Sequence, residues 1–119
     1  MSVYVDGFVL AIPKRNRAKY LRMARLGAKV WREFGALDYR ECRADDVPTG
    51  KLTSFPRAVK LKAGEEVWFS YIVYKSRRHR DQVLAKVMKD PRFAAYANPK
   101  AMPFDGKRMI FGGFKAMVG

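Results

Sequence analysis

Residues 3–34, VYVDGFVLAIPKRNRAKYLRMARLGAKVWREF, contain the first strand and the first helix of the predicted fold. Residues 3–12 are rich in β-branched and aromatic side chains, which predicts a strand that ends at Pro13. Apart from Asp6 and Gly7, both faces of this strand are apolar, as in strands that are covered on both sides.

Residues 14–34 are predicted to form an amphipathic helix that ends at Gly35. At about 100° per residue, one side of this helix is apolar. It carries Tyr20, Met23, Ala24, Gly27, Val30, Trp31 and Phe34. The opposite side is basic and carries Lys14, Arg15, Arg22, Arg25, Lys29 and Arg32.

The rest of the chain repeats this strand–helix pattern. We predict strands at residues 36–44, 65–74 and 107–118, a helix from the Ser76 cap to Lys89, and a short helical turn through Tyr96. The connection of residues 45–64 is longer than about 12–15 residues, and loops of that length are usually functional or contain some structure of their own. We expect a fixed turn at residues 54–57. The order predicts one α+β domain over residues 1–119, a ferredoxin-like βαββαβ sandwich with two helices on one face of an antiparallel sheet.

The predicted sheet has more apolar surface than two helices can cover. The first, third and fourth strands carry large apolar groups on both faces, so the face away from the helices needs a partner. A second copy of the chain, related by a two-fold axis, is the simplest candidate. We therefore expect a homodimer that associates through the sheet.

Composition limits the classes of partner and location. The 25 Lys and Arg against 11 Asp and Glu give a net charge of +14, which favours contact with nucleic acid or other anions. A single cysteine excludes an internal disulfide, and Asp6 interrupts any secretory apolar segment. No apolar run approaches the ~18 residues of a membrane span. We expect a cytoplasmic protein without a membrane partner, a metal or a cofactor.

Six strings of residues in the chain are distinctive: YVDGFVL (4–10), YREC (39–42), DVP (46–48), TSFPRAVK (53–60), VYKSR (73–77) and MPFDGKRMI (102–110). Together they resemble the YbaA-like family of uncharacterised small proteins. The resemblance implies the dimeric α/β-barrel superfamily, in which two ferredoxin-like protomers press their sheets together. That superfamily includes cofactor-free monooxygenases, isomerases and ligand-binding proteins, and fold alone selects none of these.

Asp6 is the first candidate for chemistry. A carboxylate in a strand that is apolar on both faces is costly unless it is paired. It either acts as a general acid or base in a cavity between sheet and helices, or forms an ion pair near a strand edge with an arginine such as Arg40 or Arg108. We favour the ion pair.

The other candidates are Tyr39, Glu41, Tyr71 and His79. Alternation places Tyr39 and Glu41 on one face of their strand, where they line either the same cavity as Asp6, together with Tyr71, or an ordinary core. His79, the single histidine, reads as a surface side chain whose pKa the adjacent arginines lower, or as a base or phosphate contact. Cys42 is expected to be a small buried apolar group.

The basic face of helix 14–34 supports an alternative function. Arg15, Arg22, Arg25, Lys29 and Arg32 would contact the phosphates of RNA without sequence preference, or would simply be solvated. An RNA-recognition motif shares the element order, but Glu65 and Glu66 stand where its third-strand motif should begin with a basic residue and glycine. The residues alone do not decide between three kinds of function: an enzyme or ligand-binding protein, a nucleic-acid module, and a structural dimer.

Overall fold

The computed structural model describes residues 3–119 and contains one four-stranded antiparallel sheet, in the order β2-β3-β1-β4. The central strands β1 (Tyr4–Pro13) and β3 (Glu65–Tyr74) pair along their whole length. The edge strands are β2 (Asp38–Arg43) and β4 (Ile110–Lys115). This is the predicted ferredoxin-like α+β plan. The second strand is shorter than the predicted range 36–44, because Leu37 and Ala44 join the sheet only through single backbone hydrogen bonds.

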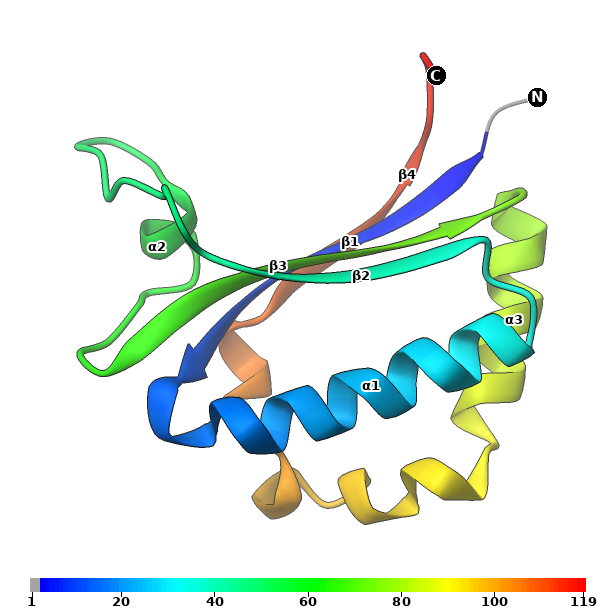
Figure 1. The fold of residues 1–119 in the computed structure, drawn as a ribbon. Coiled ribbons are helices and arrows are strands. Elements are labelled where there is room, and N and C mark those ends of the chain that lie inside the picture. Colours follow the sequence, from blue (N-terminus) through cyan, green and yellow to red (C-terminus); the bar gives the residue numbers. More distant parts are fainter. Residues whose placement is uncertain (1–2) are drawn as a thin grey trace.

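The two long helices lie on the same face of the sheet, as Figure 1 shows. A 3-10 turn, η1 (Lys14–Asn16), precedes α1 (Arg17–Glu33), so the predicted helix begins with a tighter turn than expected. The second long helix, α3 (Arg77–Met88), begins at Ser76, whose hydroxyl accepts a hydrogen bond from the His79 backbone N–H. Both predicted helices are confirmed.

The core between helices and sheet has two parts. One packs the aromatic rings of Tyr20 and Trp68 around Leu10 and Ile12. The other lies between α1 and α3 and includes Val30, Ile72, Tyr74, Val83 and Val87. Alternation along β1 and β3 brings these strand residues to the helix face, since every second side chain points the same way.

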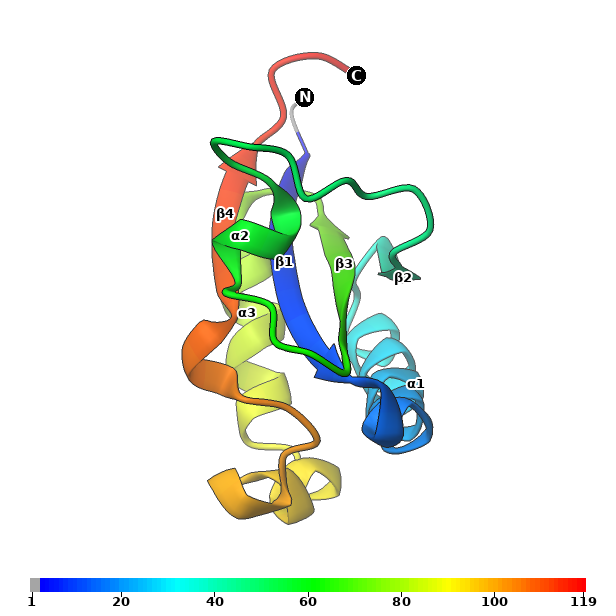
Figure 2. The ribbon, with the colours of Figure 1, turned by 90° about the vertical axis from the view of Figure 1, so that its left-hand side faces the viewer.

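The connection after β2 returns across the opposite face of the sheet (Figure 2). It contains the short helix α2 (Phe55–Ala58), and the Ser54 side chain caps it by accepting from the Arg57 N–H. The next residue, Val59, is fully buried against Val9 and Val67. The prediction of a fixed turn at residues 54–57 is confirmed, and this segment covers one end of a face that we expected to be bare.

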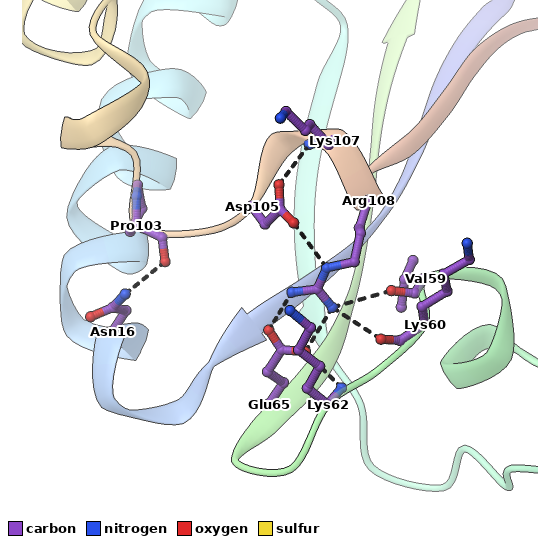
Figure 3. Close-up of polar contacts among 9 residues, drawn as sticks. All are labelled: Asn16, Val59, Lys60, Lys62, Glu65, Pro103, Asp105, Lys107 and Arg108. Atoms are coloured by element: carbon purple, nitrogen blue, oxygen red, sulfur yellow. Dashed lines mark hydrogen bonds and ion pairs between the residues drawn. The ribbon is translucent and has the colours of Figure 1, made fainter.

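Arg108 holds the connection and the chain before β4 together (Figure 3). Its guanidinium donates to both Glu65 oxygens at 2.8 and 2.6 Å and to the Asp105 carboxylate at 3.1 Å. It also donates to the backbone carbonyls of Val59 and Lys60, at 3.3 and 3.1 Å. Two of the family-like strings, 53–60 and 102–110, therefore meet at one arginine and serve structure there.

The chain between α3 and β4 is a series of 3-10 turns. These are η2 (Pro91–Tyr96), which was predicted, then η3 (Pro99–Ala101) and η4 (Gly106–Arg108). The last turn explains why β4 begins at Ile110 and not at residue 107. The β1–β4 register is continuous at Gly112 and Gly113, so there is no bulge, and the Tyr4 ring lies close against Gly113.

The sheet face opposite α1 and α3 stays partly open. Phe69, Ile110 and Phe114 on this face are 42%, 45% and 64% exposed. They surround a shallow hollow of about 470 Å³ that also includes Val5, Gly7 and Tyr71. Within residues 3–119, no helix has the length and hydropathy needed to cross a membrane.

Candidate functional site

A pocket of about 340 Å³ lies between α1, α3 and the turns that follow α3. We call it the α1–α3 pocket. It is lined by Met23, Gly27, Trp31, Tyr39, Val87, Met88, Phe93, Tyr96, Ala97 and Met102. Its volume is at the lower end of the range of about 300–1,000 Å³ that is typical of small-molecule sites.

The aromatic rings of the pocket come from three separate parts of the chain. The Trp31 ring on α1 lies 5.8 Å from the Tyr39 ring on β2 and 5.8 Å from the Phe93 ring on η2. Arg92 connects η2 to the end of α1, because it pairs with Glu33 at 2.8 Å and with Asp90 at 2.8 Å. The outer wall of the pocket is therefore a segment of short turns held on α1 by a solvent-exposed ion pair.

A partly buried carboxylate lies directly behind Tyr39. Glu41 accepts hydrogen bonds from the hydroxyls of Tyr39, at 2.9 Å, and Tyr20, at 2.7 Å. Burial raises the pKa of Glu41 above its ordinary 4.5, and the bonds from Tyr20, Tyr39 and Ser70 offset this only in part. Burial also raises the pKa of both tyrosines, and the neighbouring carboxylate raises it further. Glu41 has no arginine or lysine partner within residues 3–119.

Asp6 is ion-paired, but with a residue that the sequence did not indicate. Its carboxylate lies 3.3 Å from the Arg80 guanidinium on α3, so the predicted partners Arg40 and Arg108 are wrong. The expected strand edge is also wrong, because β1 is a central strand. Burial still raises the pKa of Asp6, against the lowering effects of Arg80 and the Tyr74 hydroxyl. Asp6 is not among the residues that line the α1–α3 pocket.

Tyr71 and Cys42 lie on the open face, away from Tyr39 and Glu41. Tyr71 lines the shallow hollow there, so the predicted cavity shared by Tyr71 with Tyr39 and Glu41 does not form. Cys42 is exposed, and its predicted burial is wrong. The reason is that β2 is an edge strand and Cys42 has the opposite orientation to Glu41 along it.

His79 has a structural role at the start of α3. Its Nδ1 accepts from the Lys75 backbone N–H at 3.0 Å, and its ring packs edge-on against Tyr74. Burial is the main cause that lowers its pKa, followed by Lys75 and Lys86. The predicted direction is confirmed, but the adjacent arginines are not the cause.

The predicted basic face, which lies on α1 and on the η1 turn before it, is exposed. Arg15, Arg22, Arg25, Lys29 and Arg32 are all solvent-exposed. Arg32 pairs with Asp38 at 3.4 Å, whereas the other four form no ion pair within residues 3–119. Every ion pair in this part of the chain uses arginine, so the lysines contribute their full charge to the surface.

The sequence did not indicate the outer wall of the pocket. Phe93, Tyr96 and Met102 belong to turns whose position on α1 depends on tertiary contacts, and the only signal was the density of aromatic residues in 91–96. In the described part of the chain, no group of three or more His, Cys, Asp or Glu side chains could hold a metal ion.

Residues 3–106 match the family described as "Protein of unknown function (DUF1428)". The chain belongs to this family. It is 50% identical over 115 residues to the uncharacterized protein YbaA of Escherichia coli K12, covering 97% of each chain, and equally to that of Shigella flexneri. These relatives confirm the family resemblance seen in the sequence.

A solved structure shares the fold. The crystal structure of a dimeric ferredoxin-like protein from an uncultured marine organism aligns with a TM-score of 0.60 and 12% sequence identity. The alignment covers 99% of this chain and 96% of that one. At this identity the likeness supports the ferredoxin-like fold and says nothing about activity.

Proposed function

We propose that this protein binds an apolar small molecule in the α1–α3 pocket. The observation that carries the proposal is the wall itself, in which Trp31, Tyr39, Phe93 and three methionines enclose about 340 Å³ beside a hydrogen-bonded tyrosine. Pockets that bind small molecules are mostly apolar with a few placed polar groups. Methionine side chains adapt readily to the shape of a ligand.

The same site would also support cofactor-free acid–base chemistry. Glu41 accepts a hydrogen bond from Tyr39, and burial raises its pKa, which makes this carboxylate a stronger base than an exposed glutamate. A proton leaving a bound molecule would pass to the Tyr39 oxygen while the Tyr39 hydrogen passes to Glu41. Binding is the primary proposal, and catalysis is its extension.

Binding can be tested with naphthalene, an uncharged probe, by following the NMR signal of the Trp31 indole N–H. We expect saturable shifts that Ala97→Phe removes, because Ala97 lines the pocket at its exposed outer wall. The matched control is Ala94→Phe, which adds the same ring to an exposed position of η2 that does not line the pocket. Equal binding by both variants would contradict the proposal.

We further propose a homodimer that associates through the open face of the sheet. Its support is the exposed apolar group around Phe69, Ile110 and Phe114, and the fold of a solved protein described as dimeric. Contiguous exposed apolar patches commonly mark interaction sites. The α1–α3 pocket is on the other face, so dimer formation would leave it accessible.

Nucleic-acid association is the second candidate function, favoured by the unpaired cations on α1. Binding should be independent of sequence and should weaken steeply with salt. Reversing Arg22, Arg25 and Lys29 to glutamate should abolish it. The same reversal at the exposed Lys100, Lys107 and Lys115 keeps the charge change equal and should weaken binding less. Tight binding to one RNA at physiological salt would contradict a non-specific role.

We also propose a cytoplasmic location. The single cysteine, Cys42, is exposed and free. A free surface thiol persists in a reducing compartment and oxidises outside it.

A further inference from the structure

The α1–α3 pocket contains no formal charge, although the chain has 25 Lys and Arg. All of its lining side chains are apolar, aromatic or methionine, and their only polar groups are two tyrosine hydroxyls and the Trp31 indole N–H. A charged molecule entering it would lose its hydration without meeting a counter-charge, which is strongly unfavourable. The pocket therefore selects for uncharged molecules despite the positive surface around it.

The hydrogen-bond donors of Trp31 and Tyr39 in the pocket already have acceptors within the protein. The Trp31 Nε1–H donates to the Tyr74 hydroxyl at 3.0 Å, so it is not available to a ligand. The Tyr39 hydroxyl has one hydrogen, and it donates that hydrogen to Glu41 at 2.9 Å. Tyr39 Oη lies against Gly27, another lining residue, and offers only its remaining lone pair.

We propose that the α1–α3 pocket takes an uncharged, largely apolar molecule with a hydroxyl or N–H group that donates a hydrogen bond to Tyr39 Oη. This inference rests on the proposed function. Glu41 fixes the direction of this hydrogen bond, because a ligand that offered only an acceptor would have to take the Tyr39 hydrogen away from a partly buried carboxylate. Glu41 would then retain Tyr20 and Ser70 as its remaining partners.

Three probes of nearly the same shape test this inference with the full-length chain. They are 2-naphthol, which carries a donor, 2-methoxynaphthalene, which lacks it, and 2-naphthoate, which is charged. We expect 2-naphthol to bind about three- to ten-fold more tightly than the ether, the effect of one neutral hydrogen bond. We expect 2-naphthoate to bind at least about ten-fold more weakly than 2-naphthol, because it enters without a counter-charge.

Tyr39→Phe should bring 2-naphthol and the ether to equal affinity. Tyr71→Phe, which removes a hydroxyl on the opposite face of the sheet, should keep the preference. Equal affinities for the two neutral probes in the wild-type protein, or tightest binding of 2-naphthoate, would overturn the inference. That wild-type comparison decides the matter even if Tyr39→Phe does not fold. Failure of naphthalene itself to bind would instead remove the proposed function.

Discussion

A side chain on Gly27 would collide with Tyr39, since a Cβ built there would lie 2.5 Å from the Tyr39 hydroxyl oxygen. Gly27 is buried in the middle of α1, where glycine costs about 1 kcal/mol relative to alanine. The helix accepts this cost at the position where the Tyr39 hydroxyl approaches it. The same hydroxyl donates a hydrogen bond to Glu41.

Gly27→Ala should therefore lower the free energy of unfolding, by about 1–3 kcal/mol, because the clash outweighs the gain in helix propensity. In a Tyr39→Phe background the nearest ring atom would be Cζ, at 3.2 Å, so the same change should cost less. Urea unfolding of the four proteins in this double-mutant cycle measures the coupling. Equal costs in both backgrounds would show that the Tyr39 hydroxyl does not require the glycine.

Arg108→Ala should be strongly destabilising. It removes a guanidinium that is 13% exposed and leaves Glu65, 8% exposed, without its partner. Breaking such a pair costs about 3 kcal/mol or more, because the remaining charge stays buried. Lys107→Ala is the matched control and should unfold near the wild-type midpoint, since Lys107 is exposed and forms no ion pair with the described residues. Similar midpoints for both variants would refute a structural role for Arg108.

Phe114→Glu should convert a dimer to a monomer. Light scattering of the wild-type protein should give about twice the 13.7 kDa chain mass, with little effect of salt on an apolar interface. Phe114 is 64% exposed on the open face, so the charge should disrupt association without disturbing the core. Leu37→Glu is the control, because Leu37 is 50% exposed just before β2 and does not line the hollow on the open face. A wild-type monomer would remove the dimer proposal.

The architecture was predictable from periodicity, because side-chain patterns decide which face of an element is buried. The boundaries of β3 and the apolar side of α1, with Tyr20, Ala24, Gly27 and Val30 buried, follow directly from the pattern. The errors concern position within the sheet. Cys42 was expected to be buried because its side chain is small and apolar, but it shares its face with Asp38 and Arg40 on an edge strand and is exposed.

The candidate site depends on contacts between distant residues, which a single sequence does not specify. Asp6 was expected to need an arginine, but only the packing of α3 against β1 brings Arg80 to it. Tyr39 and Glu41 were identified as a pair, whereas Tyr20 had been assigned to the core alone. The pocket wall at Phe93 arises from the turns after α3, where the sequence has no periodicity to interpret.

The pH dependence of stability should show the cost of burying Glu41. Its pKa in the folded protein is raised above 4.5, so between these two values the folded state binds more protons than the unfolded state. Stability from this group therefore falls as pH rises above about 4.5, and becomes constant above the folded pKa. Subtracting the unfolding free energy of Glu41→Gln from that of the wild-type protein, from pH 3 to 8, should isolate this decline, because the other carboxyl groups are common to both.

Glu66→Gln is the control of opposite sign. Arg17 lowers the pKa of Glu66, to which it donates two hydrogen bonds at 2.7 and 2.8 Å. This carboxylate adds stability above about pH 4.5 that is lost as pH falls through its lowered pKa, so the wild-type advantage over Glu66→Gln should rise with pH. A Glu41 difference curve that also rose with pH would mean that the hydrogen bonds from Tyr20 and Tyr39 outweigh burial. Glu41 would then be a weaker base than an exposed glutamate, and the proposed transfer of a proton through Tyr39 would lose its main support.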